Sequence, residues 1–167
     1  MTYKIEQIEG IGVHFAERLA AVGIHTSDDL MARCETMDGR AQLAATTDLP
    51  ASMLLTWANQ ADLMRVNGIG TGFGQLLESS GIQSVTELSE RKPENVVQLL
   101  DIVNEEKQLT RVVPPLKTVK RWVERARRMT GVGSPRMATV PSGQLASLLG
   151  ARIASPPVIE VIAMRQV

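Results

Sequence analysis

Apolar residues recur at spacings of three and four along most of the first 129 residues, which is the period of an amphipathic helix. Phe15, Ala16 and Leu19 share one face of the first such segment, and Gly23 is placed to end it. A capping-box sequence at residues 26–29 predicts the start of the next helix. No stretch alternates apolar and polar positions long enough to indicate a sheet. The pattern predicts an all-α fold.

Prolines mark the later helices. Pro50 precedes an apolar stripe that includes Trp57, and Pro93 suits the first turn of the next long helix. Pro114-Pro115 breaks the chain before a last helix. Between these segments, Asp38-Gly39 predicts a turn, with a short helix after it over residues 40–46.

The sequence contains an internal repeat. At an offset of 58, residues 8–33 lie over residues 66–91 with nine identities in 26 positions. At an offset of 65, residues 57–64 lie over residues 122–129, and a tryptophan opens both segments. Two such matches in the same order predict two homologous helical units.

The predicted organisation is two units followed by a tail. The first unit covers residues 1–65 and the second covers residues 66–129. In residues 130–167, Gly, Ser and Pro supply 12 of 38 positions, which is typical of a linker. Two segments of this tail differ in kind: residues 145–153 have the spacing of a short amphipathic helix, and residues 156–163 are apolar and β-prone.

Each unit carries a Gly-Ile-Gly turn with apolar residues on both sides, at Gly10–Gly12 and at Gly68–Gly70. Two glycines around one aliphatic residue permit backbone angles that are closed to other residues, and they let a phosphate approach the amides that open the next helix. Those amides are unpaired donors at the positive end of the helix dipole. The pattern resembles the helix-hairpin-helix family, whose turns bind the DNA backbone without reading its sequence. DNA-backbone binding is therefore what this resemblance implies.

The pattern from Tyr3 to about Met129 is also similar to a bacterial family catalogued as domain of unknown function 4332. The resembling segments are residues 3–12, 57–65, 104–107 and 113–119. This resemblance covers about three quarters of the chain. It implies an all-α fold with two tandem helix-hairpin-helix-containing (SAM-like) units, and it supplies no established activity.

The formal net charge of zero conceals a polarity between the two ends of the chain. Residues 1–106 carry 16 acids and 7 bases, a net of −9, while residues 107–167 carry 2 acids and 11 bases, a net of +9. Most of these bases fall on the last predicted helix and face outward, opposite a predicted buried stripe of Leu116, Val119, Val123 and Ala126. Such a face suits a phosphate backbone, and it equally suits the acidic half of the same chain or of a neighbouring copy.

These observations predict a non-enzymatic, sequence-independent nucleic-acid-binding protein whose partner is the phosphate backbone of DNA or RNA. The predicted contact residues lie at the two turns and on the last helix: Gly10, Ile11, Gly12, Val13, His14, Arg18, Arg65, Gly68, Ile69, Gly70, Thr71, Gly72, Lys117, Lys120, Arg121, Arg125 and Arg128. The alternative is a protein–protein interaction adaptor on the same helical repeat, with residues 142–163 docking on a partner and the acidic and basic halves allowing self-association. The scarcity of bases near the turns favours this alternative.

Several classes of site are unsupported by the sequence. One cysteine and two histidines, without ligand spacing, predict no metal site, no cofactor and no catalytic constellation. Cys34 is expected to be an ordinary cysteine on a helix surface rather than a reactive thiol. No run of 18 apolar residues and no signal-peptide pattern is present, so no membrane partner and a reducing cytoplasm are expected.

Overall fold

The computed structural model describes residues 2–131, which form eight α-helices, one 3-10 helix and no strand, so the predicted all-α class is confirmed for this part of the chain. The elements are η1 (Ile5–Gln7), α1 (Val13–Ala20), α2 (Ser27–Cys34), α3 (Met37–Thr47), α4 (Ala51–Leu63), α5 (Thr71–Ser79), α6 (Val85–Ser89), α7 (Pro93–Lys107) and α8 (Leu116–Gly131). None of these helices is long and apolar enough to cross a lipid bilayer. Almost all of the predicted tail, including residues 142–163, lies outside the described residues.

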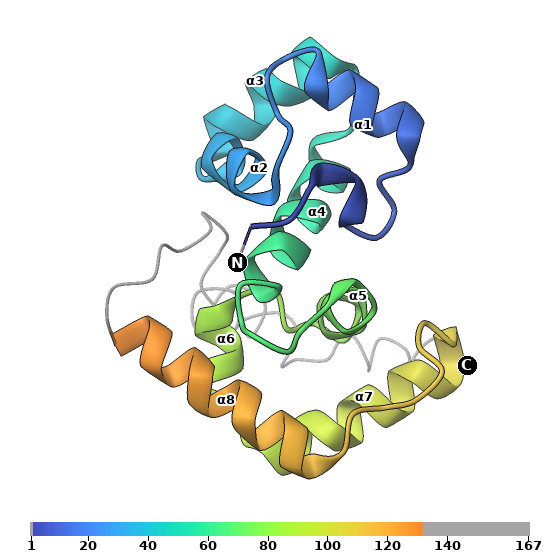
Figure 1. Cartoon of the computed structure of the whole chain (residues 1–167), viewed down its shortest axis with the longest axis vertical. Helices are drawn as coiled ribbons and strands as arrows, with labels where there is room; N and C mark the ends of the chain where they lie inside the picture. Colours follow the sequence, from blue (N-terminus) through green and yellow to red (C-terminus); the bar gives the residue numbers. More distant parts are fainter. Residues whose placement is uncertain (1, 132–167) are drawn as a thin grey trace, which may run out of the picture.

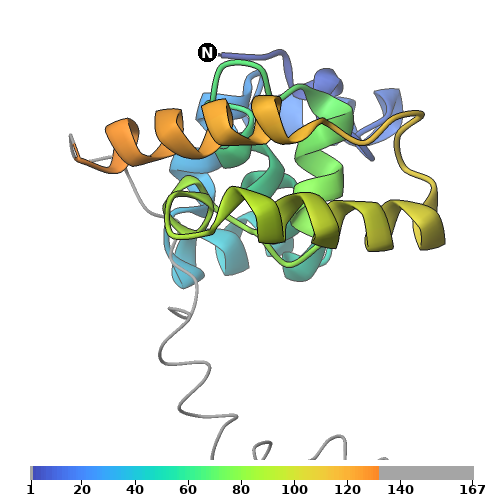
Figure 2. The same cartoon turned by 90° about the horizontal axis from the view of Figure 1, so that it is seen from below.

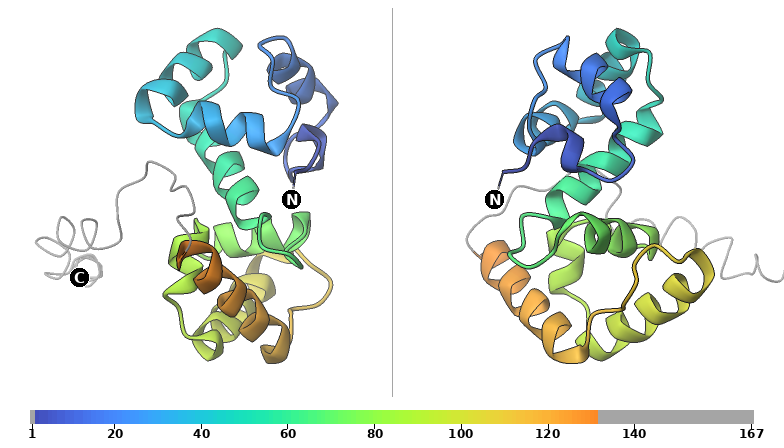
Figure 3. Two further views of the ribbon diagram at one scale, coloured as in Figure 1. Left: turned by 60° about the vertical axis from the view of Figure 1, so that its left-hand side comes forward. Right: turned by 45° about the vertical axis from the view of Figure 1, so that its right-hand side comes forward.

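Helix α4 connects two halves of the molecule. Figure 1 shows α1, α2 and α3 gathered at one end and α5 to α8 at the other, and the two views of Figure 3 show α4 running from the first group into the second. Each half has its own cluster of buried apolar side chains. Trp57 of α4 belongs to the first cluster and Leu63 of α4 belongs to the second, so one helix is part of both cores.

Local geometry repeats at the positions that the sequence aligns. Gly10 and Gly68 both have positive φ, +93° and +104°. Phe15 packs against Trp57 with ring centroids 5.4 Å apart, and its counterpart Phe73 packs against Trp122 at 5.3 Å. Both tryptophans are buried. The backbone turn and the aromatic pair beneath it therefore occur twice.

The predicted helix starts are found at the two capping sequences. The Thr26 hydroxyl accepts a hydrogen bond from the Asp29 amide, while the Asp29 carboxylate accepts one from the Thr26 amide. At the equivalent place, the Ser84 hydroxyl accepts from the Glu87 amide. Each side chain satisfies an N–H group that has no acceptor within the helix, which is why α2 and α6 begin there.

The turn predicted at Asp38-Gly39 is wrong, because both residues lie inside α3. The helix begins instead at Met37, after Thr36, whose hydroxyl accepts from the Gly39 amide. A Cβ at position 39 would lie 2.3 Å from the Arg33 carbonyl oxygen. Glycine is therefore needed here because the start of α3 packs closely against the end of α2. The Asp-Gly pair, which is typical of a turn, reflects this packing instead.

Two predictions of which side chains are buried are also wrong. Cys34 is fully buried, because Arg40 donates to the Cys34 carbonyl and holds the α2–α3 corner closed over it. Burial raises the pKa of the Cys34 thiol to about 11. Leu116, expected in the buried stripe of α8, is 37% exposed because it is the first residue of that helix, whereas Val119, Trp122, Val123 and Ala126 are buried.

Candidate nucleic-acid interface

The second glycine turn, residues 66–70, joins α4 to α5. The Ile69 amide donates to the Val66 carbonyl at 3.0 Å, and the Ile69 side chain is fully buried. Gly70 is the N-cap of α5, and its carbonyl accepts the first helical hydrogen bond from the Gly74 amide at 2.8 Å. The buried isoleucine anchors the turn, so the start of α5 is held in place from below.

The two glycines of this turn are present for different structural reasons. A Cβ on Gly68 would lie 3.0 Å from the Trp122 Nε1 atom, in a backbone conformation that L residues rarely adopt. Gly70 has ordinary extended angles, and a Cβ there would meet nothing within 4 Å. Gly68 is therefore required by packing, whereas Gly70 leaves open space in front of α5.

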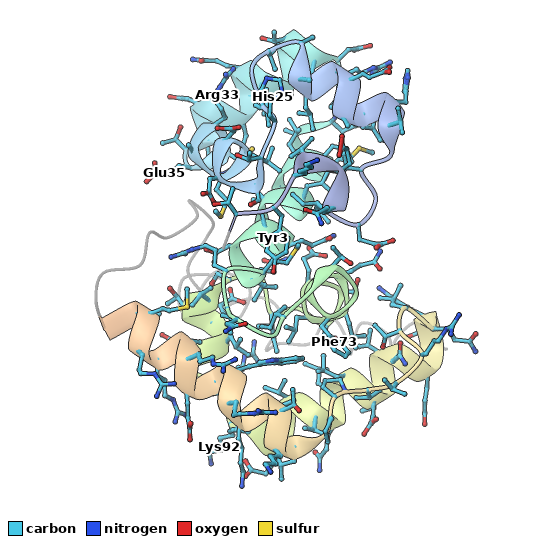
Figure 4. The ribbon with its side chains drawn as sticks, in the orientation of Figure 1. Tyr3, His25, Arg33, Glu35, Phe73 and Lys92 are labelled. Atoms are coloured by element: carbon cyan, nitrogen blue, oxygen red, sulfur yellow. The ribbon has the colours of Figure 1, made fainter. Side chains whose placement is uncertain are left out.

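The open end of α5 borders a pocket. The amides of Thr71, Gly72 and Phe73 belong to the first turn, where N–H groups have no acceptor within the helix. A pocket of about 460 Å³ is lined by Gly68, Gly70, Thr71, Gly72, Phe73, Thr110, Arg111 and Val112. Figure 4 shows Phe73 on the side of α5 that faces α7 and α8, in agreement with its contact with Trp122. The first turn of α5 thus supplies donors and a positive dipole end to this pocket.

Two arginines from distant parts of the chain lie beside this turn. Arg125 of α8 donates from Nη1 to the carbonyl of Asn67. Arg111 lines the pocket from the loop between α7 and α8. That loop is held by Asn104, whose side chain donates to the Thr110 carbonyl and accepts from the Thr110 amide, both at 2.9 Å. Local sequence reasoning found no base near Gly70 except Arg65, because these arginines are brought there by the packing of α8 and its loop.

Helix α8 carries the remaining predicted cations. Lys117, Lys120, Arg121 and Arg128 are all exposed, while Arg125 is half-buried. Arg121, Arg125 and Arg128 follow each other at spacings of four and three, so they lie on one side of the helix, the side next to the second glycine turn. Figure 2 shows α8 and α7 extended across the lower face of the molecule. This row of arginines and the pocket together make a cationic surface, called here the α8 surface.

Two other predicted bases are engaged elsewhere. Arg65 forms a salt bridge with Asp62 at 2.7 Å, and Arg18 donates from Nη1 to the Asp48 carbonyl at 3.3 Å. Asp62 is almost fully buried and also accepts from the Val85 amide at 2.8 Å. Arg65 therefore serves the buried carboxylate that ties α4 to α6 rather than lying with the α8 arginines.

The first glycine turn has the same backbone but different surroundings. Gly12 is the N-cap of α1, and Trp57 Nε1 lies 3.0 Å from where a Cβ on Gly10 would be. Ile11 is buried like its counterpart in the second turn. The residues that open α1, Val13 and His14, are both exposed. Within the described residues, a Cβ on Gly10 would meet only the Trp57 ring within 4 Å, whereas one on Gly68 would also lie 3.4 Å from Arg125 Nη1. The predicted contact residues thus separate into a cationic second turn and a first turn with little positive charge.

Two carboxyl groups at the junction of the halves have raised pKa values. Burial raises the pKa of Asp62, and the Val85 amide and Arg65 act in the opposite direction. Burial also raises the pKa of Glu78 on α5, against the hydrogen bond from the Asn59 side chain and the charge of Lys107. Both groups lie where α4 packs against the second half, and this packing buries them and so raises their pKa values.

A family model described as domain of unknown function (DUF4332) matches residues 9–129, which include both glycine turns and nearly all of α8. The chain belongs to this family. Among curated proteins, the DUF4332 chain is similar to the poly(3-hydroxyalkanoate) polymerase subunit PhaC of Haloferax mediterranei, with 43% identity over 56 residues. That segment is 34% of this chain and spans only 10% of the length of the relative. No solved structure matches the DUF4332 chain.

Proposed function

We propose that this DUF4332 chain is a non-enzymatic protein that binds the phosphate backbone of nucleic acid at the second glycine turn and the α8 surface. The observation that carries the proposal is the gathering of Arg111 and Arg125 at the open end of α5. Both residues are more than 35 positions away from Gly70 in the sequence. A helix end with free amides, an open N-cap and two guanidinium groups has the chemistry of a phosphate site.

The proposed contacts read no base sequence. Phosphate oxygens would accept hydrogen bonds from the first amides of α5, since Gly70 carries no side chain to fill that space. Arg111 would bind an adjacent oxygen, and Arg121 and Arg128 would follow the backbone along α8. Because backbone contacts position a nucleic acid without specifying its bases, the expected binding is sequence-independent.

The same proposal interprets α4, the second glycine turn and α5 as a helix-hairpin-helix unit. Helix α4 supplies the first helix, residues 66–70 the turn and α5 the second helix. The first glycine turn fits this description less well, since only the single turn of η1 precedes it. Nucleic-acid contact is therefore assigned to the second turn, and the first turn is assigned a packing role.

Fluorescence anisotropy with labelled duplex and single-stranded DNA and with RNA tests this function. If about five phosphates are contacted, the affinity falls several hundredfold between about 50 and 200 mM salt. Charge reversal of Arg121, Arg125 and Arg128 is expected to abolish binding. Absence of binding at the lower salt concentration would overturn the proposal.

A matched pair of variants tests the role of the glycine turn separately. Asp and Asn have the same shape and both are good N-caps, so Gly70→Asp and Gly70→Asn are expected to fold equally well. The Asp carboxylate repels phosphate. One added unit charge within a few ångströms of a bound phosphate corresponds to about a five- to tenfold loss of affinity relative to the Asn variant. Equal affinities of the two variants would remove the α5 end from the interface, even if α8 binds.

Protein–protein interaction is the second candidate function. It is favoured by the exposure of Val13, whose side chain is 71% accessible beside a groove on α1. An apolar side chain at a groove is a common feature of helix-docking surfaces.

A further inference from the structure

Within residues 2–131, the helix that packs on α5 has no counterpart on α1. In the second half, the end of α4 lies against α5: a Cβ on Gly74 would be 3.1 Å from Met64 Cγ, and the Asn59 side chain hydrogen-bonds Glu78. In the first half, η1 is a single turn, and residues 2–4 in front of it are not helical. They run beside residues 25–27 instead: Ser27 N donates to the Tyr3 carbonyl, and Tyr3 N donates to the Ser27 hydroxyl. No α-helix of the described part of the chain therefore covers the face of α1 that corresponds to the covered face of α5.

A groove occupies this place. It has a volume of about 570 Å³, and its lining includes Glu6, Val13, Ala16, Glu17, Ala20 and His25. Ala16 aligns with Gly74, a residue of α5 that packs closely against the end of α4. Figure 4 shows His25 in the N-terminal half, on the segment between α1 and α2 that borders the groove. We call this feature the α1 groove; its floor is apolar and its edges carry two glutamates.

Helix α8 is the repeat counterpart of α4. Trp122 lies under Gly68 as Trp57 lies under Gly10, with the same 3.0 Å approach of Nε1. The face of α4 that contacts α5 contains Asn59, Gln60 and Leu63. The offset of 65 aligns these residues with Glu124, Arg125 and Arg128 of α8. Glu124 and Arg128 are exposed and Arg125 is half-buried, so within the described residues this face of α8 has no helix packed on it.

The two open faces carry opposite net charge. Helix α8 has six bases and one acid, a net of +5, while Glu6 and Glu17 edge the α1 groove, where Lys4 is the one lysine or arginine among the described lining residues. An α4-like helix is what the repeat places against an α1-like helix. We propose that α8 of one copy of this chain docks in the α1 groove of a second copy, so that the molecules associate head to tail.

This arrangement is inferred from the repeat and does not rest on the proposed nucleic-acid binding. The contact is heterologous, because the groove and the helix are different surfaces, and it therefore extends to further copies unless a ring closes. Arg121 and Arg128 would face Glu6 and Glu17, so salt screening weakens the association. Nucleic acid and a second copy would compete for α8, whereas the α1 groove would serve self-association alone.

Sedimentation velocity on the full chain, at low and high salt, tests the proposal. The wild type is expected to form concentration-dependent oligomers that dissociate as salt is raised. The groove variant Glu6→Arg/Glu17→Arg and the helix variant Arg121→Glu/Arg128→Glu are each expected to weaken self-association at least tenfold. All four positions are solvent-accessible on the elements η1, α1 and α8, and circular dichroism verifies folding of each variant. Val13→Ser, which removes apolar contact without adding charge, is expected to weaken association as well.

The decisive arm combines both charge reversals in one chain, which restores the pairing with opposite sign and is expected to recover wild-type association. A wild type that stays monomeric at all concentrations would overturn the proposal, and so would a groove variant that associates normally or a folded combined variant that stays monomeric. DNA affinity separates this proposal from the function above. Gly70→Asp is expected to lose affinity for DNA while it still self-associates, and Glu6→Arg/Glu17→Arg is expected to do the reverse.

Discussion

Gly68 and Gly70 are two positions apart, and the fold uses them differently. At Gly68 the backbone has φ +104° and the Trp122 ring lies against the α-carbon, whereas at Gly70 neither condition holds. The same contrast holds between Gly10 and Gly12 in the first turn. The first glycine of each pair thus packs against the core, and the second lies at the surface.

Substitution by alanine separates these two roles. Gly68→Ala is expected to lower the free energy of unfolding by about 1–3 kcal/mol, because the left-handed backbone and the contact with Trp122 are both strained. Gly70→Ala changes it by less than about 1 kcal/mol, since its methyl group enters open space. Urea unfolding followed by tryptophan fluorescence measures both. Equal losses in the two variants would contradict this assignment.

Cys34 is expected to be unreactive in the folded protein. Its side chain has no exposed area, and the raised pKa of about 11 leaves almost no thiolate at neutral pH. A thiol reagent such as dithionitrobenzoate should therefore react only when the protein unfolds in guanidinium chloride. Rapid stoichiometric labelling of the native protein would show that the α2–α3 corner opens.

At the scale of elements, α4 is exceptional because it is buried on two sides. Asn59, Gln60 and Asp62 are polar and yet nearly inaccessible, since the second half covers the face that an outer helix would leave in water. Asp62 is compensated by the Val85 amide and by Arg65. Helical periodicity alone placed only the Trp57 side of α4 in a core, because polar residues at the other side gave no sign of burial.

The α4–α5 contact predicts a pH-dependent stability. The pKa of Glu78 is raised above its ordinary value of 4.5, chiefly by burial, so the ionised form opposes folding at neutral pH. That penalty disappears as the pH falls through the folded pKa toward 4.5. Glu78→Gln is therefore expected to raise the melting temperature modestly at pH 7, with a difference that vanishes below pH 4.5.

Thermal melts followed by circular dichroism between pH 4 and 8 measure this effect. Glu105→Gln, at an exposed position of α7, is the matched control and should leave the melting temperature unchanged across the range. A Glu78→Gln variant that is less stable than the wild type at pH 7 would mean that the hydrogen bond from Asn59 outweighs desolvation.

Most element boundaries could be predicted because they depend on local chemistry. The caps at Thr26 and Ser84 and the proline at Pro93 each act within one turn of the helix that they start. The error at Gly39 has the opposite origin, because that glycine accommodates a carbonyl from another helix. Where a residue is required by a contact with another helix, the sequence around it predicts the wrong local structure.

At the scale of the whole molecule, the shared helix α4 couples the two halves. Trp57 is in the first core and Trp122 is in the second, while α4 contributes to both. We expect the two halves to unfold in one transition. The single-tryptophan variants Trp57→Phe and Trp122→Phe should therefore give fluorescence melts that coincide with circular dichroism of the same variant. Two separated transitions within one variant would show that the halves are independent.

The charge polarity acquires a spatial meaning only in the folded chain. The bases of residues 108–131 lie on α8 and its preceding loop, and two of them, Arg111 and Arg125, lie beside a glycine turn that is poor in charge by itself. The first turn has nearly the same backbone, but in the described part of the chain only the Trp57 ring lies within 4 Å of a Cβ on Gly10. Two equivalent motifs are thus made unequal by what the rest of the chain packs around them.

The sequence by itself determined the helical class, the repeat and the positions of the glycine turns, because periodicity, caps and self-similarity act over short spans or by direct alignment. Only the tertiary structure decided which turn has cations, that Arg65 is bound to Asp62, that Cys34 is buried and that α1 borders a groove where α5 is covered by α4. Each of these depends on contacts between residues far apart in the chain. Such contacts depend on how whole helices pack together. A local sequence pattern shows which face of a helix is apolar, but it does not show which other element packs against that face.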